Sequence, residues 1–362
     1  MGIKNLTSFL TKQFPELLED VTLQDFAGKK IAIDTAIFMN KFKASAGNKW
    51  LDAFVSLVCW MWECNVTPIF VLDNGCPPEK ASEKKKRYEE KKKRLAKVDE
   101  LEKAIEAYNV DQVVTSILKE VYEKESKNDE NSRRKSLLLR PNVQKTFDLT
   151  VVKSKLNRMK SHLFTITPRD WENLKALFDV LKIEWILANG EAETHCAWMV
   201  KTNNASAVLS EDSDCLAYGV ETFLLKPNFS QKKLKKITFS KLLEKLELSQ
   251  DEFLDFCIMC GTDYNPNMKG IGVKRSYALI QKHRSIDSIT AGGATPKKLD
   301  IAVLKHKVVR KLFTLSDAYD SKKEVVECRP LPINRTEVAT FFFQKNMNCN
   351  VSDVLRYYNL KK

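Results

Sequence analysis

Hydrophobic and polar positions follow an α/β rhythm near the start of the chain. Two short apolar runs each end in an aspartate, Ile31-Ala32-Ile33-Asp34 and Ile69-Phe70-Val71-Leu72-Asp73. Between them, residues 50–62 carry apolar side chains at helical spacing. A strand, a helix and a second strand in this order predict a parallel sheet with helices on its faces.

The same rhythm returns after a long charged segment. Pro168 is a favoured first residue for a helix that should run to about residue 180. Strands are predicted at residues 183–187, 207–210 and 222–225, and helices from residue 239 to the end. We therefore predict an α/β fold, with a mostly parallel central sheet flanked by helices.

These patterns divide the chain into four segments. Residues 1–78 and 165–238 are predicted to form the two parts of an α/β core. Residues 79–164 form a basic helical insert, in which residues 127–134 have the composition of a loop or a disordered segment. Residues 239–362 form a helical C-terminal region, and no sequence repeat is evident.

Composition narrows the class of protein. The chain has 362 residues, 43% of them hydrophobic, but no run of eighteen apolar residues and no apolar signal stretch at its start. We expect an intracellular protein with no membrane contact, placed in the nucleus (the host nucleus for a viral source) or else in the cytoplasm. The nine cysteines are scattered, and the lone pair Cys257 and Cys260 predicts core thiols rather than a zinc site.

The net charge of +13 favours a polyanionic partner such as nucleic acid. Residues 79–164 hold 23 Lys or Arg against 15 Asp or Glu, so eight of the thirteen excess positive charges lie in the insert. A basic chain can also be merely well solvated. The charge alone therefore only favours a nucleic-acid partner.

Acidic residues stand beyond the carboxyl ends of the predicted strands, where sites form in open parallel sheets. They are Asp34, Asp73, Glu191, Glu193, Asp212 and Asp214, with Asp263 after a predicted helix as a further candidate. Any one of them alone is typical of a solvated loop or a helix cap. Two carboxylates about 4 Å apart repel by roughly 4 kcal/mol at an effective dielectric constant of about 20, so a converging set needs cations. Carboxylates suit Mg²⁺ or Mn²⁺, and a pair of such ions can hydrolyse a phosphodiester.

Seven short motifs, taken together and in this order, resemble those of the flap endonuclease family, within the wider XPG-like nucleases. They are Met1-Gly2-Ile3, Ile31-Ala32-Ile33-Asp34, Val71-Leu72-Asp73, Gly190-Glu191-Ala192-Glu193, Glu211-Asp212-Ser213-Asp214-Cys215-Leu216, Gly261-Thr262-Asp263-Tyr264 and Gly270-Ile271-Gly272-Val273-Lys274-Arg275. The similarity runs from residue 1 to about residue 285, and more weakly to near residue 355.

The resemblance implies a PIN/XPG-like nuclease core, a helical cap and a C-terminal helix-two-turn-helix region. It implies cleavage of branched DNA at 5′ flaps by two Mg²⁺ ions, for which Mn²⁺ can substitute, with 5′-exonuclease activity in replication or repair. It carries metal-ligand roles to all seven acids named above. It also implies that Gly2 becomes the amino terminus, lies close to the active site and contacts DNA. We expect a monomer, and a compact chain suits a viral or other minimal replication system.

Two basic elements are candidates for DNA binding. Gly270 and Gly272 resemble a hairpin that brings backbone N–H groups to a duplex phosphate and, in the family, binds K⁺; Lys274 and Arg275 follow it. A second element, with helical spacing, comprises Lys80, Lys84, Arg87, Lys91 and Arg94. The resemblance makes Lys80 and Arg87 the catalytic phosphate-steering cations, and Lys84 and Lys91 are further DNA contacts. A charged helix is otherwise usually a solvated surface.

The chain departs from the family in three places. The stretch between Asp73 and Glu191 is longer than usual, which concerns the cap. Asn40 stands where the family often has a base-stacking tyrosine, for which Phe38 is a candidate substitute. The chain shows no sliding-clamp motif before Lys362. Alternative functions are a sister 5′-exonuclease, a junction resolvase, an RNA-directed nuclease, or a non-catalytic recombination or joining factor.

Overall fold

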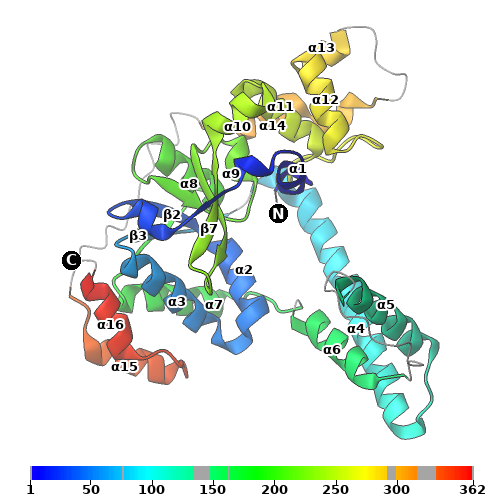
Figure 1. Ribbon diagram of the computed structural model, residues 1–362, viewed down its shortest axis with the longest axis vertical. Helices are drawn as coiled ribbons and strands as arrows, with labels where there is room; N and C mark the ends of the chain where they lie inside the picture. The colour runs from blue at the N-terminus through cyan, green and yellow to red at the C-terminus, as the bar shows by residue number, and fades with distance from the viewer. Residues whose placement is uncertain are drawn as a thin grey trace. The chain divides into compact units, whose positions relative to one another are not determined.

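The computed structural model describes residues 2–75, 77–133, 147–161, 163–291, 299–315 and 332–360. It divides into two compact units. The first consists of Met1–Phe42, Asn48–Glu83 and Ile166–Lys362, and the second of Lys43–Gly47 and Lys84–Thr165. Each unit is described by itself (Figure 1).

The first unit is built on a sheet in which the described residues form seven strands, in the order β1-β7-β6-β5-β2-β3-β4. The strands are β1 (Glu19–Val21), β2 (Lys30–Asp34), β3 (Thr67–Leu72), β4 (Glu184–Leu187), β5 (Ala207–Leu209), β6 (Thr222–Asn228) and β7 (Lys233–Thr238). Neighbouring strands from β4 to β6 pair in parallel, whereas β7 pairs antiparallel with both β6 and β1. The predicted α/β fold with a mostly parallel sheet is confirmed.

Alternate residues of the central strands pack into two hydrophobic cores, one on each face of the sheet. Along β2, Ala32 belongs to one core, and Ile31 and Ile33 belong to the other. Strand β3 repeats this alternation, with Val71 on the first side and Phe70 on the second. Since successive side chains of a strand point to opposite faces, a parallel sheet covered by helices on both faces is hydrophobic throughout.

Helices cover both faces (Figure 1). The core that contains Ala32 is covered by α1 (Leu6–Gln13), α8 (Ala192–Lys201), α9 (Asp214–Ala217), α10 (Phe239–Leu246), α11 (Gln250–Cys260), α12 (Val273–His283), α13 (Ile286–Ala291) and α14 (His306–Leu312). The core that contains Ile31 is covered by α2 (Thr35–Ala46), α3 (Trp50–Glu63), α7 (Pro168–Val180), α15 (Arg335–Gln344) and α16 (Val351–Leu360). Short 3-10 turns are η1 (Pro15–Leu17), η2 (Leu23–Phe26), η3 (Gly47–Lys49), η4 (Pro78–Lys80) and η5 (Ile301–Leu304).

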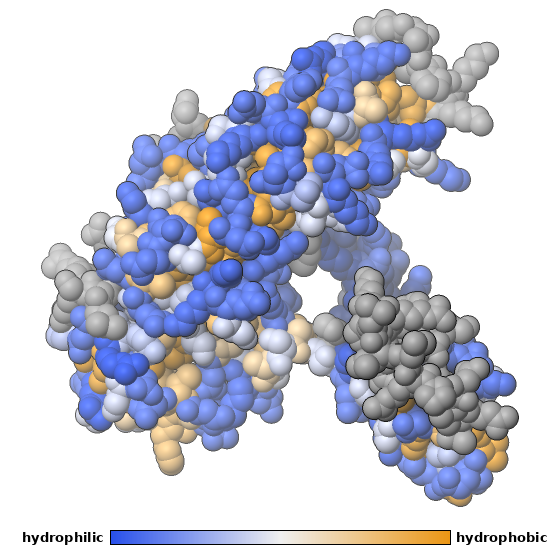
Figure 2. All heavy atoms as spheres, viewed as in Figure 1, coloured by the Kyte–Doolittle hydropathy of each residue, from blue (hydrophilic) through white to orange (hydrophobic). Residues whose placement is uncertain are grey.

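The second unit is helical, with α4 (Ala81–Asp111), α5 (Ser116–Arg133) and α6 (Leu149–Ser161). It has a small core of its own, which includes Val98, Leu101, Leu118 and Val152. The carboxylate of Glu125 accepts hydrogen bonds from Lys155 and Arg158, which joins α5 to α6. Hydrophilic residues make up much of the visible surface of the first unit (Figure 2).

Several local predictions can now be compared with the structure. Helix α7 begins at Pro168 as expected, with Thr167 and Asp170 forming a capping box. Cys257 and Cys260 are buried core thiols, as predicted. The loop predicted at residues 127–134 is wrong for residues 127–133, because α5 continues to Arg133; residue 134 lies outside the described residues. No helix among the described residues is long and apolar enough to cross a membrane.

Candidate metal centre

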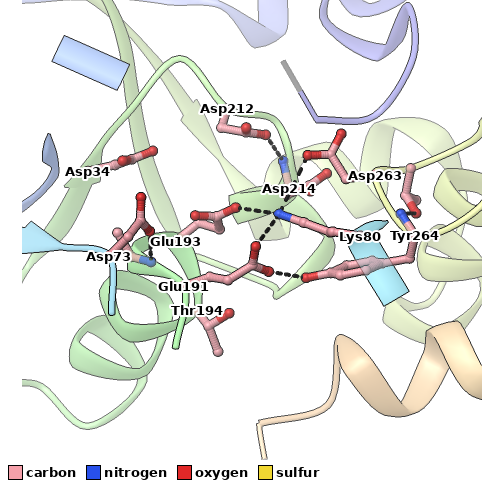
Figure 3. Close-up of polar contacts among 12 residues, drawn as sticks. Asp34, Asp73, Lys80, Glu191, Glu193, Thr194, Asp212, Asp214, Asp263 and Tyr264 are labelled. Atoms are coloured by element: carbon pink, nitrogen blue, oxygen red, sulfur yellow. Dashed lines mark hydrogen bonds and ion pairs between the residues drawn. The ribbon is translucent and has the colours of Figure 1, made fainter. Parts of the chain in front are cut away.

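Seven carboxylates converge beyond the carboxyl ends of four parallel strands (Figure 3). Asp34 is the last residue of β2, and Asp73 follows β3 directly. Glu191 and Glu193 stand at the start of α8, after β4, whereas Asp212 and Asp214 follow β5. The chain order reverses between β2 and β5, so the cluster lies at the switch point of the sheet. Asp263 reaches the cluster from the segment after α11.

Backbone pairing and one hydroxyl hold these segments together. The N–H of Asn74 donates to the carbonyl of Gly190 at 2.8 Å, and the N–H of Ala192 donates to Asp73 Oδ1 at 2.8 Å. The Ser210 hydroxyl donates to Asp34 Oδ2 at 2.9 Å and accepts from the N–H of Asp212 at 3.0 Å. Strand ends that are far apart in sequence are thereby fixed beside one another.

Burial makes the ionised carboxylates costly in the protein alone. Burial, with a smaller contribution from Glu193, raises the pKa of Asp73 to about 6. The same two causes raise the pKa of Asp212 to about 6. Burial also raises the pKa of Asp34 and of Asp214 well above the usual aspartate range, and neighbouring carboxylates add to the shift. The cluster is therefore short of positive charge.

The Lys80 side chain supplies part of that charge. It is buried, and its Nζ lies 2.5 Å from Glu191, 3.2 Å from Glu193 and 3.5 Å from Asp263 (Figure 3). Burial works to lower the pKa of Lys80, but Glu193 and Glu191 outweigh it, so the pKa is raised and the ammonium stays charged. The sequence predicted Lys80 as a phosphate-steering cation of a basic stripe near the proposed metals, but not its ion pairs with the acids.

Tyr264 is a member of the site that the sequence did not single out. Its hydroxyl donates to Glu191, and its ring centroid lies 5.1 Å from the Lys80 Nζ. Tyr218, whose own hydroxyl accepts from Thr194 at 2.8 Å, lies next to it. The signal available in the sequence was the position of Tyr264, directly after Asp263 in a motif that already carried the family resemblance.

Gly2 lies against the acidic cluster, as the resemblance implied. Its φ is +78°, and a Cβ at this position would stand 2.0 Å from Asp212 Oδ1 and 2.9 Å from the nitrogen of Asp214. The next two residues are hydrogen-bonded to two separate segments. The Ile3 N–H donates to Ser213 Oγ at 3.0 Å, and the Lys4 N–H donates to the Gly261 carbonyl at 3.0 Å. Only glycine fits here.

The donor set suits a hard divalent cation. Asp34 Oδ1 and both carboxylate oxygens of Asp214 are buried without a hydrogen-bond partner among the described residues. Such oxygens are costly to bury unless they bind a cation or a donor. Within the same residues, no group of three or more His, Cys, Asp or Glu side chains is placed to hold a metal ion, so the carboxylates would have to move to bind one. Glu191, Glu193 and Asp263 share the Lys80 ammonium.

The glycine hairpin lies before α12. Gly270 and Gly272 are exposed, Gly270 has a φ of +77°, and a Cβ at either position would meet no atom within 4 Å. Gly272 is the N-cap of α12, whose first turn carries the exposed Lys274 and Arg275. The guanidinium of Arg275 donates to the Gly270 carbonyl at 3.1 Å, which ties the hairpin to the helix.

The remaining basic candidates belong to the second unit. Lys84 and Arg87 are exposed on the first turns of α4. The Lys91 Nζ donates to the Phe164 carbonyl at 3.0 Å and to Thr165 Oγ1 at 2.7 Å. Lys91 therefore also connects α4 to the last residues of the same unit.

The stacking substitute considered for Asn40 is ruled out. Phe38 is fully buried, and its ring packs against Phe42 with the centroids 5.6 Å apart. It cannot stack on a nucleic-acid base without leaving the core. The exposed Asn40 side chain donates to the Ala36 carbonyl at 2.8 Å.

Comparison with known proteins identifies the family. Residues 1–94 match the XPG N-terminal domain, and residues 182–263 match the XPG I-region. A probable RAD2-like endonuclease of Invertebrate iridescent virus 6 is 34% identical over 345 residues, which cover 86% of this chain and 79% of the relative.

Two solved structures have the same fold. The flap endonuclease-1 from Methanococcus jannaschii has a TM-score of 0.58 at 21% identity, covering 96% of this chain and 97% of that one. The catalytic core of Rad2 in complex with DNA substrate has a TM-score of 0.59 at 15% identity, over the whole of both chains. The chain belongs to the XPG family of structure-specific nucleases, and it is a phosphodiester hydrolase.

Proposed function

We propose that this nuclease cleaves 5′ flaps of DNA near single-strand/double-strand junctions by two-metal-ion hydrolysis, with 5′-exonuclease activity, in DNA replication or repair. The observation that carries the proposal is the convergence of seven carboxylates, six of them buried, beside Gly2; six stand at or beyond the carboxyl ends of β2 to β5, and Asp263 follows α11. The names of its relatives, a RAD2-like endonuclease and a flap endonuclease, agree with it.

The metal ions would be Mg²⁺, with Mn²⁺ as a substitute, and the seven acids would hold them. They are Asp34, Asp73, Glu191, Glu193, Asp212, Asp214 and Asp263. When bound, a pair of such ions supplies an activated water and stabilises the leaving oxygen of the phosphodiester. The buried oxygens of Asp34 and Asp214 that lack partners are the groups with most to gain from a cation.

Duplex DNA would be held away from the acids by the hairpin before α12. Gly270 and Gly272 leave the backbone open to a phosphate, and the start of α12 offers a positive helix end together with Lys274 and Arg275. These contacts grip the backbone and carry no sequence information. A K⁺ ion in this hairpin is part of the proposal, on the strength of the family.

Cations near the reacting phosphate complete the proposal. Lys80 already lies at the acids, and it would steer the scissile phosphate together with Arg87. Lys84 and Lys91 would add positive charge along α4 for the single-stranded flap. A positively charged group positioned where negative charge builds up lowers the barrier more effectively than one on an open surface.

The substrate is tested with end-labelled DNA. Flap, nicked, Holliday-junction and single-stranded substrates, with an RNA strand as a further arm, would be compared under single-turnover conditions with Mg²⁺ or EDTA. We expect the 5′ flap to be cleaved fastest, at a single site near the junction. Cleavage should require Mg²⁺. Preference for a blunt or nicked end, for the four-way junction, or for RNA would instead identify the sister activities.

A further inference from the structure

Lys80 is in an unusual position for a residue expected to bind a DNA phosphate. Only 7% of its surface is exposed, and its ammonium contacts carboxylates from two separate parts of the chain. Glu191 and Glu193 come from the start of α8, and Asp263 comes from the segment after α11. The side chain thus joins parts of the acidic cluster that would otherwise repel one another.

Tyr264 also contacts this ammonium and one of its carboxylate partners. The tyrosine ring lies 5.1 Å from the Lys80 Nζ, within the range of a cation–π interaction, while the hydroxyl donates to Glu191. Glu191 is therefore bound by both residues at once. An ammonium that is enclosed in this way has a defined place in the protein, unlike a lysine on a solvated helix.

A buried ammonium and a divalent ion have overlapping roles at these carboxylates. Either one neutralises negative charge that the protein cannot leave unpaired, and both need the same oxygen atoms. The two cations would repel each other if they shared Glu191, Glu193 and Asp263 at close range. Binding of one therefore opposes binding of the other.

We propose that Lys80 is an internal counter-ion, which occupies the acidic cluster in the metal-free protein and is displaced from Glu191, Glu193 and Asp263 when divalent metal binds. The inference rests on the proposed function, since it assumes that these carboxylates are metal ligands. It adds that the metal-free site is held together by the enzyme's own cation. Once displaced, the Lys80 ammonium is available to a DNA phosphate, so metal loading prepares the same residue for its substrate role.

The test is the affinity of the full-length chain for Ca²⁺ without DNA, measured by isothermal titration calorimetry. Lys80→Met keeps the length of the side chain and removes its charge. Lys41→Met is the matched control, because Lys41 pairs with Glu211, which adjoins Asp212 but is not one of the seven acids. We expect Lys80→Met to bind Ca²⁺ at least about fivefold more tightly than the wild type. Lys41→Met should stay within about twofold.

The direction of the change separates this role from a structural one. A lysine that merely shaped the site would, when removed, disorganise the carboxylates and weaken Ca²⁺ binding. An unchanged or weaker affinity in Lys80→Met, with normal binding by the wild type, overturns the counter-ion proposal and leaves the proposed function intact. A wild type that binds neither Ca²⁺ nor Mn²⁺ contradicts the proposed function itself, and the counter-ion role with it.

A second measurement follows the Lys80 ammonium in the wild type directly. In a ¹H–¹⁵N spectrum of lysine ammonium groups, an enclosed Lys80 should give a signal protected from exchange with water, identified by its loss in Lys80→Arg. Saturating Ca²⁺ should abolish that protection. A Lys80 signal that is unaltered at saturation would show that the ammonium stays on the carboxylates, and would refute the displacement.

Discussion

The Tyr264 hydroxyl donates a hydrogen bond to Glu191, the same carboxylate that lies 2.5 Å from the Lys80 Nζ. Tyr264 thus positions a proposed metal ligand without being one. Tyr264→Phe keeps the ring beside Lys80 and removes only this hydrogen bond. We expect about tenfold slower single-turnover cleavage and a higher Mg²⁺ concentration at half-maximal rate, since a hydrogen bond to a charged group contributes about 1.5 kcal/mol or more.

Tyr277→Phe is the control for Tyr264→Phe, because the Tyr277 hydroxyl donates to the Leu246 carbonyl at 3.0 Å and has no contact with the acids. It should leave the Mg²⁺ dependence unaltered. If Tyr264→Phe changed stability but not the Mg²⁺ dependence, Tyr264 would be a structural residue only.

Gly2→Ala tests how closely the start of the chain approaches the acids. The added methyl group would stand 2.0 Å from Asp212 Oδ1, so either Gly2 or Asp212 must move. We expect cleavage to fall by at least about tenfold, because a displacement of about 1 Å at a reacting centre can cost a hundredfold. Gly28→Ala is the control: its φ is +74° and its Cβ would meet no atom within 4 Å, so it reports backbone strain alone. Equal losses of cleavage rate in the two variants would show that the clash with Asp212 is not the cause.

Arg87→Ala tests whether α4 contributes to catalysis or only to surface charge. If Arg87 steers the scissile phosphate, its removal should slow single-turnover flap cleavage by about a hundredfold. Flap binding should weaken only a few-fold. Lys91→Ala should have a milder effect on the rate, since Lys91 is bonded to Phe164 and Thr165. Both constants would be measured for each variant. Normal cleavage of bound flap by Arg87→Ala would show that α4 contributes only surface charge to DNA binding.

The raised carboxylate pKa values predict how pH affects stability. Asp73 and Asp212 titrate near pH 6 in the folded protein, against about 3.9 in an unfolded chain. Between these values the folded state holds more protons, so these groups lower the free energy of unfolding as pH rises through this window in EDTA. Ca²⁺ binds the deprotonated acids, so the rise in Tm that it causes should grow from about pH 5 to about pH 7. Calorimetry with and without Ca²⁺ checks this, and a metal effect independent of pH would contradict it.

The parallel half of the sheet and its acids were predictable, because β2, β3 and β5 are buried apolar runs with a carboxylate at or just after the end. Asp34 and Asp73 show this most clearly. The other half was not. Strand β7, rich in lysine, was not predicted; its Lys235 and Lys236 pair with Asp20 and Glu19 of β1, so the charges are neutralised across the sheet edge. Such pairing depends on contacts between distant segments, which periodicity does not report.

The burial of Lys80 was not predictable from the sequence, although its closeness to the proposed metals was expected. Its spacing to Lys84 and Arg87 predicts a common helical face, yet Lys80 belongs to η4 and is buried, whereas Lys84 and Arg87 are exposed on α4. Which side of a short turn becomes buried is decided by the acids that surround it. Likewise, the aromatic Phe38 gave no local sign that it belongs to the core rather than to a stacking surface.

The central claim is that the converging acids hold catalytic metal, and Asp212→Ala tests it most directly. Asp212 is buried; its N–H donates to the Ser210 hydroxyl, and its Oδ1 accepts from the Asp214 N–H. Glu211→Ala is the control, since Glu211 is its neighbour in the chain but pairs with Lys41. Single-turnover cleavage of a 5′ flap in Mg²⁺ would be measured beside flap binding in Ca²⁺. We predict that Asp212→Ala slows cleavage by at least about three orders of magnitude with binding retained, and that Glu211→Ala does not. Near-normal cleavage by Asp212→Ala would contradict the account.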